Sequence, residues 1–251
     1  MEEHLKIIED SLKQTESQEE ALKIVLSLST DAESLTLFSS SKAILQLLID
    51  LSTEDRTANT ALQILINFSQ NEALSSMMVK TGIFNVLFEY LKTHLKPDQA
   101  DEKAEIGYVA TENMYEVRSA TKSNIPLVLM LISNLTTYTF GRVKFLNASE
   151  NPALKTFMLE NIIGMTTFFK DSEFFNFGAN IITNCTIDAL KVHADAKAPL
   201  CTLQVFTPLF DMMTSIKKSP VKRLKITEGV KNLMFNHSTH LKELKESDVL
   251  S

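Results

Sequence analysis

The chain has 251 residues, of which 44% are hydrophobic and 22% are charged, and its formal net charge is −6. This composition is that of a folded protein with a sizeable core, and the negative charge argues against nonspecific attraction to nucleic acid or anionic lipid. Only six Gly and six Pro are present, and alternating Val-rich segments are absent, so the sequence favours helices over a β-sandwich or barrel.

Two cysteines and the absence of targeting signals indicate where the protein works. Cys185 and Cys201 provide no disulfide framework, which suits a reducing compartment. The acidic N-terminus lacks the apolar core of a signal peptide. The longest apolar run, 125–132, is far shorter than the roughly 20 residues that cross a bilayer. We therefore predict a cytoplasmic or nucleocytoplasmic protein with no membrane partner.

One helical segment recurs along the chain, and we call it the amide segment. Each copy places apolar residues on one helix face, followed by a small polar residue and then by Ser or Thr. The polar residue is an amide in four copies and Ser27 in the first, weaker copy; the amides are Asn67, Asn134, Asn184 and Asn236. A helix that cannot bury its apolar face alone must stack on its neighbours. The recurring segment therefore predicts stacked helical units.

The spacing of the amide segments indicates which type of helical repeat the chain forms. The intervals from Ser27 through the four amides are 40, 67, 50 and 52 residues, whereas armadillo and HEAT units run about 40–47 residues. We predict an all-α, armadillo/HEAT-like right-handed helical-repeat solenoid of about five units, forming a single domain over residues 1–251. The stretch at about 94–121 is charged and poor in aliphatic residues, so we expect an insertion or mobile loop there. The polar tail at 242–251 is expected to fray.

Local signals between the amide segments predict where helices begin and end. Asn71 should cap the helix that follows it, and Gly82 should end that helix by adopting a left-handed backbone. Residues 83–91 then carry the next apolar stripe at helical spacing. Pro126 suits the first turn of the helix that holds the second amide, because its missing N–H has no partner there anyway.

The amides admit two interpretations. An Asn inside a helix is mildly unfavourable, so its recurrence at one register requires a compensating benefit. The amides of Asn67, Asn134, Asn184 and Asn236 could hold the backbone of an extended partner segment through a donor and an acceptor together. Each could instead bond a neighbouring unit and stabilise the stack. Both interpretations stay open, and we take the four residues as candidate partner-binding residues.

The order and the residues of several motifs resemble those of a known family. The motifs run from 61–69 to Gly82, then from Ser133–Thr136 to Gly141-Arg142, and then from Asn184-Cys185-x-x-Asp188 to 200–209. In this order they are similar to the HGH homologue family of armadillo-like proteins. Arg142 matches the arginine of the family's Gly-Arg pair. Thr186 and Ile187 depart from the family's Asn-Cys-Cys-Phe-Asp phrase.

The resemblance implies a function and partners. Members of this family act as folding chaperones for translation elongation factor 2, so the resemblance implies that client, with chaperonin and heat-shock protein 90 as further partners. It implies a monomer that binds protein and does no bond chemistry. The other function left open is a generic armadillo scaffold or adaptor that binds extended peptide segments. The chain has no Trp, the residue that importers of this shape use to clamp lysine, which argues against peptide import.

No constellation of residues predicts an enzyme, a cofactor or a metal site. There is no glycine-rich phosphate loop and no Gly-x-Ser-x-Gly elbow. Cys185, His193 and Cys201 match no zinc spacing, and His237 with His240 lacks further ligands of fixed spacing. We expect a non-catalytic protein without cofactor or metal, while an enzyme site assembled from several units stays a remote alternative.

Overall fold

The computed structural model is all-α, and no strand occurs in the part of the chain that it describes. That part comprises residues 2–94, 124–146, 162, 166, 175–187, 209–214, 216 and 219–234. The insertion predicted at about 94–121 and the tail at 242–251 lie almost entirely outside these residues. The chain divides into two compact units: residues 1–99 with 115–141, and residues 100–114 with 142–251.

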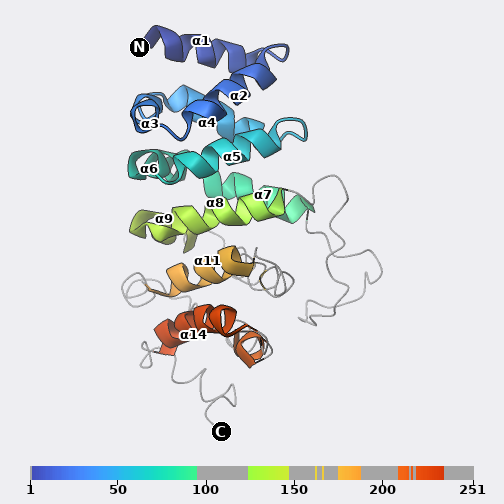
Figure 1. The fold of residues 1–251 in the computed structure, drawn as a ribbon, viewed down its shortest axis with the longest axis vertical. Helices are drawn as coiled ribbons and strands as arrows, with labels where there is room; N and C mark the ends of the chain where they lie inside the picture. The colour runs from blue at the N-terminus through green and yellow to red at the C-terminus, as the bar shows by residue number, and fades with distance from the viewer. Residues whose placement is uncertain are drawn as a thin grey trace. The chain divides into compact units, whose positions relative to one another are not determined.

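The first unit contains eight helices in the described residues. They are α1 (Glu2–Lys13), α2 (Gln18–Leu28), α3 (Ala32–Phe38), α4 (Lys42–Leu51), α5 (Ala58–Phe68), α6 (Glu72–Thr81), α7 (Ile83–His94) and α8 (Ile125–Thr137). Helices α2, α5 and α8 carry the first three amide segments and lie side by side, with α5 packed against both others (Figure 1). Helices α3, α4 and α5, and then α6, α7 and α8, follow one another as two triplets. Helices α3 and α4 meet at 96°.

Helix ends in this unit follow the predicted local signals. The side chain of Asn71 accepts a hydrogen bond from the Leu74 N–H at 3.1 Å and caps α6. Gly82 ends α6 with φ of 92°, a left-handed conformation that favours glycine, and α7 begins at the next residue. Pro126 lies in the first turn of α8. These three predictions are confirmed.

Apolar side chains from the triplets form the core of the first unit. Helices α5 and α8 contribute most of their residues to it; in α5, for example, Ile64, Leu65 and Phe68 are fully buried. The Phe68 ring packs on the ring of Phe38 from α3, with 5.1 Å between centroids. The predicted apolar faces of the second and third amide segments therefore form the packed sides of α5 and α8.

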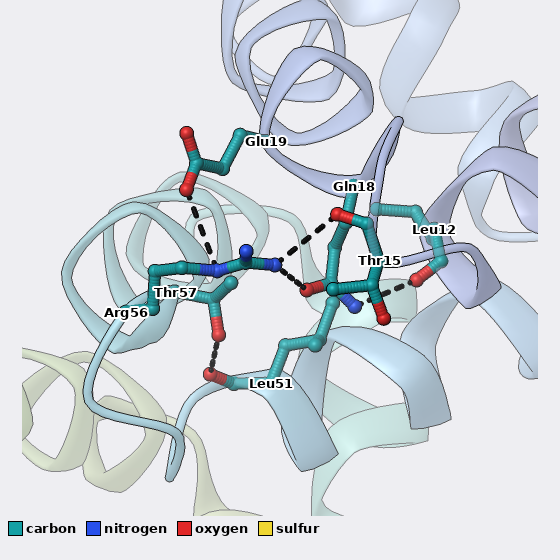
Figure 2. Close-up of polar contacts among 7 residues, drawn as sticks. All are labelled: Leu12, Thr15, Gln18, Glu19, Leu51, Arg56 and Thr57. Carbon is teal, nitrogen blue, oxygen red and sulfur yellow. Dashed lines mark hydrogen bonds and ion pairs between the residues drawn. The ribbon is translucent and has the colours of Figure 1, made fainter.

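Polar contacts join the α1–α2 turn to the α4–α5 turn, as Figure 2 shows. The Arg56 guanidinium donates to the Thr15 carbonyl at 3.3 Å and to Gln18 Oε1 at 2.9 Å, and its Nε lies 3.4 Å from a Glu19 carboxylate oxygen. Beside it, the buried Thr57 hydroxyl donates to the Leu51 carbonyl at 2.8 Å. The contacts of Arg56 are exposed or partly buried, whereas the contact of Thr57 is buried.

This difference in exposure gives a prediction. Thr57→Val should lower the free energy of unfolding by about 1–3 kcal/mol, because it removes a buried donor while keeping the side-chain shape. Arg56→Ala should lower it by less than about 1 kcal/mol, because exposed ion pairs contribute little. Urea denaturation of the two variants measures both values. A larger loss for Arg56→Ala would contradict this ranking.

The second unit contains two long described helices, α11 (Phe175–Ile187) and α14 (Pro220–Met234), which pack against each other. Helix α9 (Thr139–Leu146) follows α8 and spans the division between the units. In the described part of the chain no single helix is long and apolar enough to cross a membrane; α3 and α4 pass that test only as a bent pair, by length and composition.

Candidate functional site

Asn67 and Asn134 lie at equivalent places near the C-terminal ends of α5 and α8. The Asn67 Nδ2 donates to Ser29 Oγ at 2.7 Å, and Ser29 is the residue that follows the last turn of α2. In the same way, the Asn134 Nδ2 donates at 2.8 Å to Ser69 Oγ, which follows the last turn of α5. Each amide therefore bonds the end of the preceding amide-segment helix.

The acceptor hydroxyls are held by their own helices. Ser29 Oγ donates to the Leu26 carbonyl at 2.7 Å, and Ser69 Oγ donates to the Ile66 carbonyl at 2.6 Å. Both serines are 1% exposed. A hydroxyl has one proton, so once it is donated backward the oxygen can only accept. The amide of the next helix supplies the donor, which explains why Asn and Ser recur two residues apart in the amide segment.

In the first copy of the amide segment, Ser27 stands in place of Asn. The Ser27 hydroxyl instead donates to the Ile24 carbonyl within α2.

The hydrogen bonds between helices use only part of each amide. Asn67 and Asn134 are both half-exposed. In the described residues neither side chain makes another hydrogen bond, so each keeps its Oδ1 acceptor and one N–H donor toward solvent. A donor and an acceptor on one planar amide match the C=O and N–H of an extended backbone. Stacking and partner binding are therefore compatible at both residues.

The second unit contains a similar bond with a different residue. Asn184 is half-exposed on α11, and Asn236 lies outside the described residues. The Nδ2 of Asn232 on α14 donates to Thr186 Oγ1 at 3.3 Å. Thr186 follows Asn184 by two residues, as Ser69 follows Asn67. Asn232 thus makes the kind of bond that Asn67 and Asn134 make, and the prediction for Asn236 stays a prediction.

Cys185 and Arg142 are both buried in the second unit. Complete burial raises the pKa of the Cys185 thiol to about 12, and the positive charge of Arg142 acts in the opposite direction. A thiol in this state stays protonated at neutral pH and is a poor nucleophile. The arginine of the predicted Gly-Arg pair therefore lies near the cysteine of the Asn-Cys phrase, although 43 residues of sequence separate them.

The raised pKa predicts how Cys185 reacts. In a Cys201→Ser variant, iodoacetamide at pH 8 should modify Cys185 at least a hundredfold more slowly in the native protein than in urea. The sign for stability follows from proton linkage: the unfolded thiol ionises near pH 8.5, so stability should fall as pH rises from there toward about 12. Mass spectrometry of the alkylated protein measures the rate. Rapid native labelling would show that the thiol is accessible.

In the described residues, no group of three or more His, Cys, Asp or Glu side chains could hold a metal ion. His193, Cys201, His237 and His240, which sequence spacing brought into consideration, lie outside the described residues.

Comparisons with known proteins identify no relative. No family model matches the chain, and searches of curated proteins and of solved structures likewise find no match. Membership of the HGH homologue family therefore stays a prediction from the motifs.

Proposed function

We propose that this chain is an armadillo/HEAT-like right-handed solenoid of about five units that binds protein and catalyses no reaction. Two successive helix triplets in the first unit support this architecture, as do the 96° bend between α3 and α4 and the lateral packing of α2, α5 and α8. The bonds from Asn67 to Ser29 and from Asn134 to Ser69 support a repeated stacking geometry.

The binding function is inferred from the donor and the acceptor of each amide that make no bond to the neighbouring helix. Asn67 and Asn134 each present one donor and one acceptor on a half-exposed surface, after their contact with the preceding helix has fixed their orientation. A preorganised amide loses little side-chain entropy when it binds a partner backbone. Repeated weak contacts of this kind allow a client segment to be held and released without nucleotide hydrolysis.

The identity of the client is proposed from the resemblance of the motifs to the HGH homologue family. We propose that the protein acts as a chaperone or adaptor that assists folding of translation elongation factor 2 in the cytoplasm, with chaperonin or heat-shock protein 90 as further partners. Co-purification of tagged protein from its own cells, followed by mass spectrometry, tests this. Enrichment of elongation factor 2 supports the chaperone; a different stoichiometric partner would favour the generic adaptor.

A matched pair of variants separates binding from stacking. The double variant Asn67→Ala/Asn134→Ala removes the exposed amides together with two hydrogen bonds between helices. The variant Ser29→Ala/Ser69→Ala removes the same two bonds between helices, together with the bonds from the two hydroxyls to the Leu26 and Ile66 carbonyls, but leaves the amides on the surface. At about 1 kcal/mol per hydrogen bond, the asparagine variant should lower stability by about 2 kcal/mol and the serine variant by up to about 4 kcal/mol.

The two variants should differ in co-purification. We expect the asparagine variant to lose at least tenfold of the recovered partner and the serine variant to retain most of it. Equal loss in both would show that the amides act only in stacking, and the proposed binding site would be wrong.

A further inference from the structure

Helices α5 and α8 each expose one narrow stripe. In α5 every residue is buried except four, and in α8 every residue is buried except four. The exposed and half-exposed residues are Asn59, Thr60, Gln63 and Asn67 on α5, and Leu127, Met130, Asn134 and Thr137 on α8. We call this set the neutral stripe. Residues three, four and seven apart share one helix face, so each row of four is continuous.

The two rows of the neutral stripe face the same side of the first unit. Near the helix starts, Asn59 Nδ2 donates to Asn124 Oδ1 at 2.9 Å, and near the ends Asn134 donates to Ser69. The helices therefore run parallel. Asn67 and Asn134 stand in the same relation to the helix before them, which places the two rows in equivalent orientations.

The neutral stripe lacks ionisable residues. The 11 residues of α5 and the 13 of α8 include no Asp, Glu, Lys or Arg, although 22% of the whole chain is charged. The neighbouring helix α2 differs, because it exposes Glu19, Glu20 and Lys23. An exposed surface without charge in a charged protein calls for an explanation other than solubility.

We propose that the neutral stripe binds an uncharged, extended segment of a client polypeptide, with apolar side chains packed on Leu127 and Met130 and its backbone bonded by the amides. This inference rests on the proposed function and specifies its ligand. Neighbouring helices lie about 8–10 Å apart, a distance that about three residues of extended chain cover. Asn67 and Asn134 are thus spaced to meet two backbone groups of one segment.

The selectivity follows from charge. A Lys or Asp side chain laid on the neutral stripe would lose hydration and gain no opposite charge. An apolar side chain loses nothing on leaving water and gains contact with Leu127 and Met130. Such segments are exposed in a folding intermediate and buried in the finished fold, so a folded client would release itself.

Peptide binding tests the inference. The probes are fluorescein-labelled heptapeptides with blocked ends: a neutral one of alternating Thr and Ile, and versions with two Thr replaced by Lys or by Asp. A further version has two methylated backbone nitrogens. Fluorescence anisotropy should give the neutral peptide at least tenfold higher affinity than either charged version, and N-methylation should lower its affinity at least tenfold.

One substitution should reverse the preference. Met130→Glu places a carboxylate on the neutral stripe at a half-exposed position, and should raise the affinity for the Lys peptide above that for the neutral one. Met130→Gln, which has nearly the same shape without the charge, should keep the original order. Thermal melts check that both variants are folded.

The outcomes separate this inference from the proposed function. Tighter binding of the Lys peptide to the native protein, weakening with salt, would overturn the neutral ligand while leaving an extended-segment site in place. Failure of all peptides would also overturn it. If no peptide binds but Asn67→Ala/Asn134→Ala still loses its partner in co-purification, the proposed function stands. If this variant keeps its partner, the proposed function and the present inference are both wrong.

Discussion

Replacing Phe68 by Ala should lower the free energy of unfolding of the first unit by about 4 kcal/mol. The side chain is fully buried in α5, and its ring lies 5.1 Å from the ring of Phe38 in α3. Truncation loses the transfer free energy of the ring and leaves a cavity between α3 and α5, and Phe→Ala changes in cores cost about 3–5 kcal/mol. The urea midpoint should fall by more than about 1 M.

Phe68→Leu is the matched control, because leucine refills most of the cavity and should cost less than about 2 kcal/mol. Hydrogen-exchange mass spectrometry of peptides covering residues 58–68 reports on α5 directly, whereas the bulk urea curve combines both units. Similar exchange rates in Phe68→Ala and in the native protein would show that this aromatic contact does not hold α3 and α5 together.

Local features of the first unit could be predicted because their causes lie within a few residues. The Asn71 cap needs only an N–H three residues ahead, and the Gly82 helix end needs only a backbone without Cβ. The apolar faces of the amide segments follow helical spacing, which a single segment reveals. All-α structure in the described residues is therefore confirmed.

The partners of the amides could not be predicted in the same way. Asn67 bonds a serine 38 residues earlier, and Asn134 bonds one 65 residues earlier, so each pairing depends on how helices stack. The recurrence of Asn and Ser two residues apart was visible in the sequence, but its meaning requires knowing that the hydroxyl proton is already donated within its own helix.

The lack of charged residues in α5 and α8 is a feature of the sequence whose meaning depends on the fold. The absence of charge from α5 and α8 can be read directly from the sequence, yet only the burial pattern shows that eight uncharged residues form one surface. The apolar neighbours of Asn236 predict the amide there and do not point to Asn232. The bond from Asn232 depends on a hydroxyl acceptor on another helix, Thr186 of α11, which the apolar pattern of one segment does not reveal.

Gly141→Ala, at the glycine of the Gly-Arg pair, should lower the stability of the protein markedly although it adds only one methyl group. Gly141 is buried in α9, and a Cβ built there would lie 1.9 Å from the Leu135 carbonyl oxygen and 2.8 Å from its carbon. The obstacle is backbone in the last turns of α8, which cannot rotate aside as a side chain can. Relieving the clash requires α9 to move away from α8, at a cost of about 3 kcal/mol.

For a chain of this length, that loss corresponds to a fall in melting temperature of about 6–12 °C. Gly229→Ala is the control, since the nearest atom to its Cβ would be the side-chain Ile182 Cγ2 at 3.2 Å, and the Thr183 atoms would lie at ordinary contact distances of 3.8 and 3.9 Å. Alanine also gains about 1 kcal/mol of helix propensity within α14. Differential scanning calorimetry should show a lower transition for Gly141→Ala and an unchanged or higher one for Gly229→Ala. Equal melting of the two variants would mean that α9 does not pack closely on the end of α8. The glycine of the Gly-Arg pair would then need a functional explanation, because close packing would no longer account for it.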